Sequence, residues 1–209
     1  MRLDDVPQPD SRTARAALEV VTAYCSPALV DHCLRSYVWA ASYGVLHGIG
    51  FDAELLYVSA MLHDIGLVTE FDSHTVPFEE VGGHVAWVFG AGAGWPVERR
   101  GRAAQIIVRH MGGEVDPGAD PEGYLLRTAT GFDIAGRAPD GWPAEFRAEV
   151  VRRLPRSSLV EEFLRLFEEQ ARRKPGCAAA AAVASGLAGR MAANVLDDAK
   201  IVDRPPGPR

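Results

Sequence analysis

The stretch Ser59-Ala60-Met61-Leu62-His63-Asp64-Ile65-Gly66 ends an apolar run with a histidine and an aspartate side by side. An imidazole and a carboxylate at the end of a buried helix are costly to leave without partners. Two interpretations are open. The pair is an ordinary helix C-terminus, where the helix dipole favours His63 and Asp64 is exposed, or it belongs to a polar site whose other members lie elsewhere in the chain.

Helix signals continue on both sides of this stretch. Serine and aspartate N-caps, first-turn prolines and closing glycines delimit segments with the apolar period of a helix. The predicted helical segments are 26–48, 52–66, 77–94, 97–111, 120–133, 143–154, 159–174 and 178–193. We find no two-residue hairpin turn between alternating apolar runs. The sequence therefore predicts an all-α fold.

Length and composition describe an ordinary globular chain. Its 209 residues are 47% hydrophobic and 24% charged, and a chain of this length has room for one sizeable core. We expect one domain over residues 13–200, with flexible tails over 1–12 and 201–209.

Charge and hydropathy narrow the class of partner. The 28 acidic residues outnumber the 22 Lys and Arg, giving a net charge of -6, which argues against binding to a nucleic-acid backbone. No apolar stretch approaches the roughly 20 residues that span a bilayer, and the first residues lack the pattern of a secretory signal. We therefore expect a cytoplasmic protein that acts on a small molecule and has no membrane partner. A homo-oligomer stays open.

Several familiar motifs fail on inspection. Cys25, Cys33 and Cys177 are odd in number and never spaced as C-x-x-C, so they predict neither a disulfide framework nor a thiolate zinc site. The glycine-rich stretch 90–94 follows a predicted helix and lacks the Lys-Ser/Thr ending of a phosphate-binding loop. Neither H-E-x-x-H nor G-x-S-x-G occurs. We therefore look for function at the His63-Asp64 pair.

Other candidate ligands lie on the predicted inner faces of separate helices. His32 precedes the pair, and His84, His110 and Asp133 follow it. Each alone is more often a core histidine or an exposed carboxylate. Together, imidazoles and carboxylates converging from several helices predict a divalent metal site, suited to Fe, Mn, Zn, Co or Mg.

The order His32, His63-Asp64, Asp133 on consecutive helices resembles the HD superfamily of metal-dependent phosphohydrolases. The resemblance covers roughly residues 26–137, and the LHDIG segment is its most specific part. It implies an HD-domain-like helical bundle in which those four residues hold a metal. The helix signals of the sequence predict further helices over 143–200.

More narrowly, four segments resemble the cyanamide hydratase-like branch of that superfamily. They are Asp31-His32-Cys33-Leu34-Arg35-Ser36, Ala60-Met61-Leu62-His63-Asp64-Ile65-Gly66, Phe78-Glu79 and Ala104-Gln105-Ile106-Ile107-Val108-Arg109-His110. The chain departs from that branch in two places. Cys33 stands where serine is usual, and His84 stands where an acidic residue is more common.

The same residues allow one metal or two. The four ligands alone predict one ion, which we favour, whereas His84 and His110 fit the extra ligand positions of dinuclear HD enzymes. For His84 the alternative is a surface histidine. For His110 it is a side chain that supports the metal or binds the substrate.

The resemblance and the chemistry together suggest catalytic roles. A metal supplies activated water. Asp64 is the natural proton acceptor, and His110 is a candidate to protonate the leaving group. Arg35, one turn after His32, is a candidate to hold a substrate anion, although a surface salt bridge is an equal alternative. Glu79 and His74 are weaker pocket candidates.

Two reactions and one non-catalytic role compete. The first is hydrolysis of a small substrate, which we expect to be a phosphate ester. The second is hydration of a small nitrile such as cyanamide. The third is a non-catalytic module that binds a metal or a small ligand.

Overall fold

The computed structural model describes residues 1–197, and within that part of the chain it contains only helices and connecting loops. The all-α prediction is confirmed, and so is the single domain. The α-helices are α1 (Arg12–Tyr24), α2 (Pro27–His47), α3 (Ala53–Leu62), α4 (Phe78–Gly92), α5 (Val97–His110), α6 (Pro121–Ala135), α7 (Ala144–Arg153), α8 (Leu159–Arg173), α9 (Ala178–Ala184) and α10 (Leu187–Ala192). Short 3-10 turns are η1 (Leu3–Asp5), η2 (Ile65–Leu67), η3 (Pro139–Gly141) and η4 (Val195–Asp197).

The predicted caps start three of the central helices. Ser26 accepts a hydrogen bond from the Leu29 backbone and begins α2, with proline at the first helical position. Asp52 and Asp120 cap α3 and α6 in the same way. Each cap satisfies a backbone N–H that the first helical turn leaves without a partner. These helices therefore begin where the sequence places them.

One predicted helix is divided. The sequence predicts a single helix over 178–193, but the structure ends α9 at Ala184 and begins α10 at Leu187. Gly186 lies between them with φ +84°, a left-handed backbone conformation that glycine adopts without steric cost. The alanine-rich run therefore makes two short helices. The helix α1 was not among the predicted segments.

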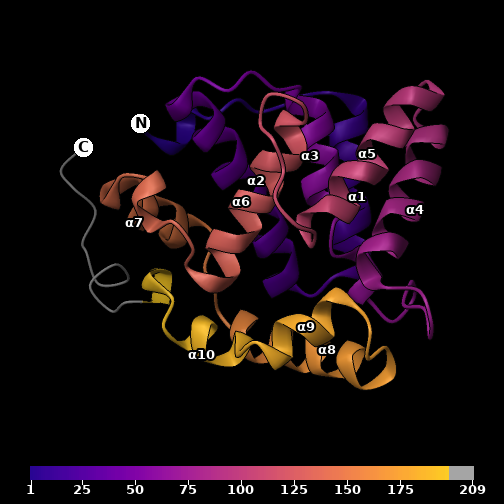
Figure 1. Ribbon diagram of the computed structural model, residues 1–209. Coiled ribbons are helices and arrows are strands. Elements are labelled where there is room, and N and C mark those ends of the chain that lie inside the picture. Colours follow the sequence, from indigo (N-terminus) through magenta and orange to yellow (C-terminus); the bar gives the residue numbers. More distant parts are fainter. Residues whose placement is uncertain (198–209) are drawn as a thin grey trace.

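The chain packs as a bundle with a second layer across one end. Helices α1 to α6 form the bundle, in which α2 packs against α3 and α6, and α5 packs against α4 and α6. In Figure 1 helices α8, α9 and α10 cross the lower end of the bundle. Apolar contacts join the two layers, because Phe78 of α4 packs with Phe163 and Phe167 of α8. The two layers enclose the polar residues described below.

The segment predicted as an N-terminal tail, residues 1–12, is partly packed. Val6 is 2% exposed, and the Tyr37 hydroxyl donates to the Pro7 carbonyl, so part of the segment predicted as an N-terminal tail packs on the bundle. The domain boundaries themselves stay a prediction, and the predicted tail over 201–209 lies outside the described residues. Among residues 1–197, no helix is long and apolar enough to cross a membrane.

Candidate metal centre

The His63-Asp64 pair lies where α3 ends. His63 follows the last helical residue, and its Nδ1 lies 2.7 Å from the Ala60 carbonyl, one of the acceptors that a helix end leaves free. Gly66 follows at once in η2. A Cβ at Gly66 would lie 2.2 Å from the Phe78 carbonyl oxygen, so only glycine lets the start of α4 approach this turn. The LHDIG segment therefore turns sharply and keeps both polar side chains inside.

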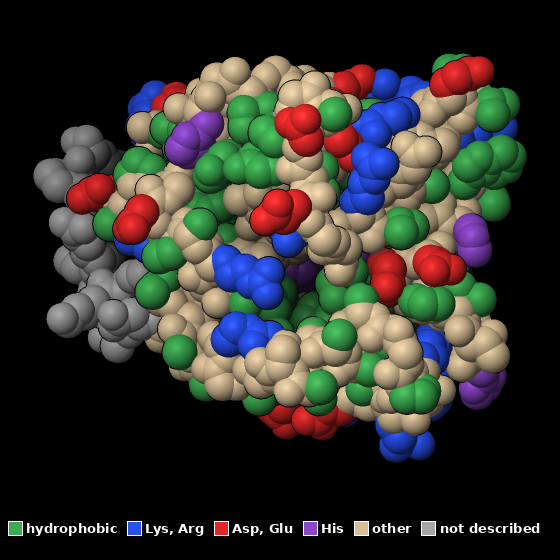
Figure 2. All heavy atoms as spheres, in the orientation of Figure 1, with side chains coloured by type: hydrophobic (Ala, Val, Ile, Leu, Met, Phe, Trp, Pro, Cys, Tyr) green, Lys and Arg blue, Asp and Glu red, His purple; other side chains and the backbone are tan. Residues whose placement is uncertain are grey.

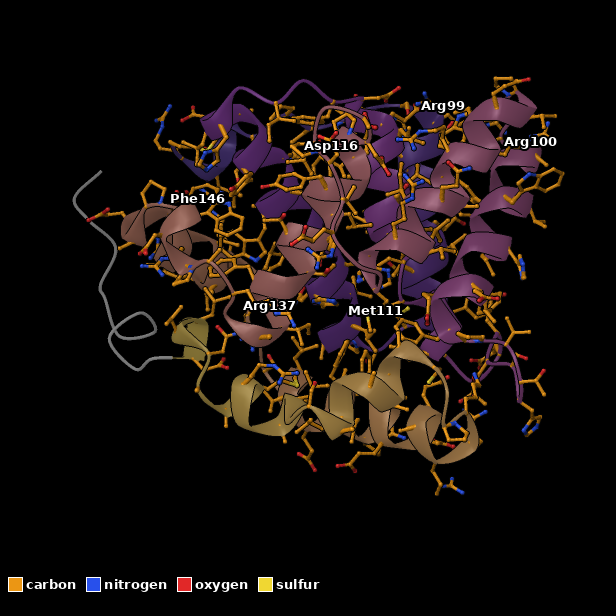
Figure 3. All side chains as sticks on the ribbon, viewed as in Figure 1. Arg99, Arg100, Met111, Asp116, Arg137 and Phe146 are labelled. Atoms are coloured by element: carbon orange, nitrogen blue, oxygen red, sulfur yellow. The ribbon has the colours of Figure 1, made fainter. Side chains whose placement is uncertain are left out.

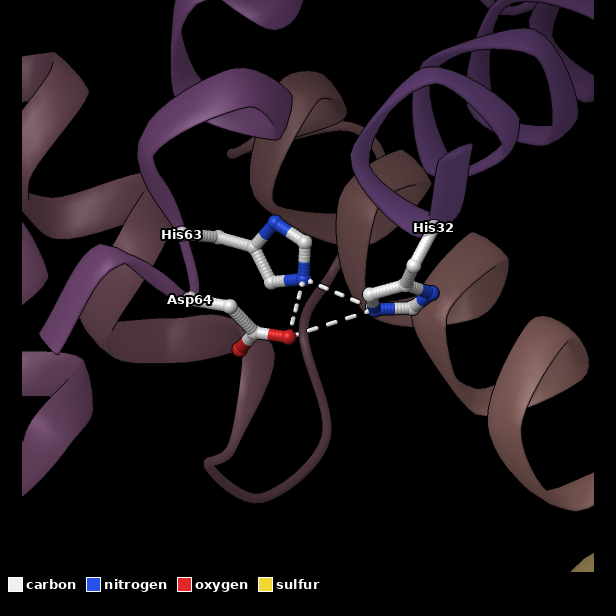
Figure 4. Close-up of side chains that lie close together, drawn as sticks. All are labelled: His32, His63 and Asp64. Atoms are coloured by element: carbon white, nitrogen blue, oxygen red, sulfur yellow. Dashed lines mark hydrogen bonds and ion pairs between the residues drawn. The ribbon is translucent and has the colours of Figure 1, made fainter. Parts of the chain in front are cut away.

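His32 of α2 meets the pair from a different helix. Its Nε2 lies 3.2 Å from His63 Nε2 and 3.3 Å from Asp64 Oδ2, and His63 Nε2 lies 3.2 Å from the same oxygen. Figure 4 shows the three side chains converging. All three are at most 1% exposed. We call His32, His63 and Asp64 the His/Asp centre.

Hydrogen bonds at Nδ1 fix the orientation of the two imidazole rings. Nδ1 of His63 must donate, because its partner is a backbone carbonyl. Nδ1 of His32 lies 2.7 Å from the carboxylate of Asp133 and donates to it. Each ring, when neutral, therefore directs the lone pair of Nε2 at the other ring and at Asp64. Two such nitrogens and a carboxylate in contact require a positive charge among them, which a proton on a ring or a metal ion supplies.

The electrostatics of Asp64 agree with that requirement. Burial opposes its ionised form, but positive charge on the neighbouring His63 and His32 rings more than offsets this and holds the pKa of Asp64 below its usual value. Neither carboxylate oxygen has a hydrogen-bond partner among the described residues, although both are buried. Mixed imidazole and carboxylate ligands about 3 Å apart fit a divalent ion with metal–ligand bonds of roughly 2.0–2.2 Å. The residues present therefore fit the metal predicted from the sequence.

His110 completes the surroundings of Asp64. Its Nε2 lies 3.7 Å from Asp64 Oδ1, and its Nδ1 donates to the Ile107 carbonyl, so Nε2 again carries the lone pair. Burial, with His63 nearby, lowers the pKa of His110 to about 4. His110 is therefore a neutral base beside the His/Asp centre.

Asp133 lies elsewhere than the sequence predicted. We expected a metal ligand, but its carboxylate lies behind His32, on the ring nitrogen that faces away from His63 and Asp64. Two more side chains occupy its oxygens: Arg35 binds both of them at 2.9 and 3.0 Å, and Trp39 Nε1 donates to Oδ1 at 2.8 Å. A fully bonded carboxylate orients His32 rather than joining the group of three.

Arg35 also differs from its predicted role. Arg35, the candidate for anion binding, is fully buried, and its Nη1 donates to the carbonyls of Leu154 and Pro155. Its guanidinium forms a buried ion pair with Asp133 rather than facing a substrate. Sequence reasoning missed Arg156, a buried residue whose guanidinium lies 3.7 Å from Asp133. No local pattern marks it, because its partner is distant in the sequence.

The remaining candidates lie away from the His/Asp centre. His84 and His74 are exposed, and His84 faces a shallow groove between α4 and α5. The position of His84 leaves the two-metal alternative without one of its ligands. Glu79 is buried and its Oε2 has no hydrogen-bond partner among the described residues. Burial, more than the nearby Glu80, raises the pKa of Glu79. Its side chain does not line the cavity described next.

A cavity of about 550 Å³ opens over the His/Asp centre. His110 and Met111 flank its floor, and Phe163 and Phe167 of α8 supply an apolar wall. The His32 and Phe163 rings meet edge to face, 5.6 Å apart. Figure 2 shows a hollow at the junction of the two layers, with histidine visible in its depth. The centre is therefore buried within the protein but open to a ligand.

Comparison with known proteins finds a family match over part of the chain. The HD domain family matches residues 29–129, which include His32, His63, Asp64 and His110 but end before Asp133. Over this stretch the chain matches the HD superfamily, in agreement with the resemblance seen in the sequence. HD domains are metal-dependent, in agreement with the fit of the His/Asp centre to a divalent ion.

The chain is also similar to two named yeast proteins. Cyanamide hydratase DDI2 of Saccharomyces cerevisiae is 26% identical over 175 residues, which cover 81% of this chain and 77% of the relative. Cyanamide hydratase DDI3 of the same yeast matches with the same identity and coverage. These similarities confirm the resemblance of this HD protein to the cyanamide hydratase-like branch.

Proposed function

We propose that this HD protein is a metal-dependent hydrolase that directs water at a small substrate bound over the His/Asp centre. The observation that carries the proposal is the convergence of His32, His63 and Asp64 on one buried point at the floor of an open cavity. Side chains that served only packing would not leave both oxygens of a buried carboxylate without a hydrogen bond.

The three residues of the centre would hold a divalent ion. When bound, a divalent ion lowers the pKa of water and polarises the bond under attack. Asp133 fixes the ring of His32, and the Ala60 carbonyl fixes that of His63, so neither imidazole needs to reorganise. Phe163 and Phe167 limit the number of waters near the reacting bond.

His110 moves the proton. Its Nε2 faces Asp64 with a lone pair, so it accepts a proton from the attacking water and then returns that proton to the leaving group. The sequence suggested Asp64 as acceptor and His110 as donor. The hydrogen bond to the Ile107 carbonyl favours His110 in both roles, with Asp64 retained as a ligand.

Two substrates are consistent with this centre. A small phosphate ester is our first candidate, and it rests on membership of the HD superfamily, since Arg35 no longer supports it. Hydration of a small nitrile is the second, and the similarity to two cyanamide hydratases favours it. If the protein is instead a non-catalytic module that binds a metal or small ligand, we expect turnover of neither substrate.

Turnover decides among these functions. The purified protein, supplied in turn with Mn, Fe, Co and Zn, is assayed against a panel of phosphate esters and against cyanamide. We expect metal-dependent release of phosphate that His63→Ala abolishes and that His84→Ala, an exposed histidine outside the centre, leaves unchanged. Turnover of cyanamide without release of phosphate from any ester would favour nitrile hydration over phosphate-ester hydrolysis. Absence of turnover with every metal would refute catalysis.

A further inference from the structure

Three arginines line the cavity above the His/Asp centre. Arg127 belongs to α6, Arg137 follows the end of α6, and Arg190 belongs to α10. We call these three residues the arginine rim. Figure 3 places Arg137 at the junction between the bundle and the second layer, and Figure 2 shows basic side chains gathered beside the hollow there. Among the described residues that line the cavity, Asp64 is the one carboxylate. A local excess of positive charge in a chain of net charge -6 requires a reason.

The arginine rim is free of counter-ions within residues 1–197. Arg127 donates only to the Gly112 carbonyl, and Arg190 donates to Ser185 and to the Ala182 carbonyl. The Arg137 side chain is exposed and has no hydrogen bond or ion pair among the described residues. By contrast, Arg102 and Arg173 form ion pairs with carboxylates elsewhere on the protein. The rim therefore keeps its charge available to a ligand.

One donor of Arg190 is also unsatisfied. Its Nε is buried and has no hydrogen-bond partner among the described residues. Because this Nε is shielded from solvent, a ligand in the cavity would meet the terminal nitrogens of the guanidinium, and an anion is the acceptor that a guanidinium prefers. Arg190 is held in place by its bonds to the end of α9, so its orientation needs little further ordering when a ligand arrives.

We propose that the arginine rim is an anion-binding subsite, and that the substrate carries a phosphate or carboxylate group distant from the bond that reacts. The inference rests on the proposed function for the position of the reacting bond over the His/Asp centre. The lining of the same cavity also includes the apolar side chains of Ile134, Phe163, Phe167 and Leu187. A substrate that reaches both the centre and the rim would therefore also have apolar side chains around it.

The size of the cavity agrees with a substrate that reaches from the His/Asp centre to the arginine rim. A volume of about 550 Å³ lies in the range of pockets that enclose molecules of many heavy atoms. A nitrile of three heavy atoms, such as cyanamide, occupies a small part of it and offers no charge to the rim. The arginine rim therefore selects an anionic substrate larger than cyanamide, whichever addition of water the centre performs.

Calorimetric titration of the purified protein with inorganic phosphate and with malonate tests the subsite, and their relative affinities show which anion it prefers. We expect Arg137→Ala/Arg190→Ala to weaken binding of the preferred anion by about 10-fold or more, the loss of at least one charge-assisted hydrogen bond. Arg152→Ala/Arg172→Ala removes the same charge from exposed positions outside the cavity and should change little. Because Arg190 also bonds to α9, Arg137→Ala alone is measured as the variant with no side-chain bond to lose.

A further variant separates this inference from the proposed function. His63→Ala disrupts the His/Asp centre and should retain anion binding, because the rim is made by other residues. Equal anion affinity in wild type and Arg137→Ala/Arg190→Ala, or no binding of either anion to wild type, would overturn the subsite. Intact anion binding without any turnover would instead overturn the proposed catalysis and leave the subsite standing.

Discussion

Asp133 Oδ2 lies 2.7 Å from His32 Nδ1, on the side of the ring opposite the His/Asp centre. The carboxylate therefore fixes the tautomer and the orientation of His32 from behind. Burial opposes ionisation of Asp133, but Arg35 and His32 more than offset it and hold its pKa well below the usual value. Asp133 is an anion that makes His32 a stronger ligand.

Asp133→Asn tests this role. The amide keeps the shape but loses the charge, so we expect metal affinity to fall by about 10-fold to 100-fold while the ion is still bound. Competition with a chelator measures the affinity. Unchanged affinity would contradict the role. Complete loss of metal in a folded variant would show that Asp133 is a direct ligand, as the sequence alone predicts.

Arg35→Met tests the buried ion pair. Removing the guanidinium leaves Asp133 with less compensation in a site where both side chains are fully buried. We expect a loss of about 3–5 kcal/mol in the free energy of unfolding. The control is Arg153→Met, which removes an exposed ion pair with Asp4 and should cost about 0–1 kcal/mol. Equal unfolding midpoints in urea for the two variants would refute the structural role of Arg35.

His84→Ala tests how many metal ions the protein holds. The side chain is exposed on α4 and outside the central cavity, so its removal should leave the metal content at about one ion per chain. Elemental analysis of the wild type and the variant, prepared side by side, gives the answer. Two ions in the wild type and one in the variant would restore the two-metal alternative.

Asp72 links the second layer to the bundle and predicts an acid dependence of stability. It accepts hydrogen bonds from Gln170 at 2.9 Å and Lys174 at 3.1 Å, and it pairs with Arg173. Burial opposes ionisation, but these partners more than offset it and lower the pKa of Asp72 below its ordinary value of 3.8. The unfolded chain therefore takes up the proton first as the pH falls.

This contribution to stability is present above pH about 4 and is lost as the pH falls through the lowered pKa of the folded state. Asp72→Asn should lower the melting temperature at pH 7 and have a smaller effect near pH 3. Melting curves of the wild type and the variant at both pH values measure the difference. An effect that is the same at both pH values would contradict the assignment.

The sequence predicted the helices and the centre for local reasons. Caps such as Ser26 and Asp52 act within one turn, and the LHDIG segment carries its ligands and its required glycine together. Those features depend on neighbouring residues. The prediction of His63 and Asp64 as members of a polar site therefore agrees with their burial.

Long-range pairings were beyond the same reasoning. Arg35 and Asp133 are separated by 98 positions, and nothing near either residue indicates that they bind each other rather than a substrate and a metal. The positions of Arg137 and Arg190 at one cavity likewise depend on how α10 packs over α6. The break at Gly186 was missed because alanines on both sides favour a continuous helix.

The metal content of the purified protein tests the central claim most directly. We predict about one divalent ion per chain by elemental analysis of the wild type. His63→Ala and Asp64→Ala should each lose that ion while circular dichroism still shows a helical fold, because the bundle core is formed by apolar residues. Metal content equal to wild type in both variants, or a wild type that binds no divalent ion, would contradict the account.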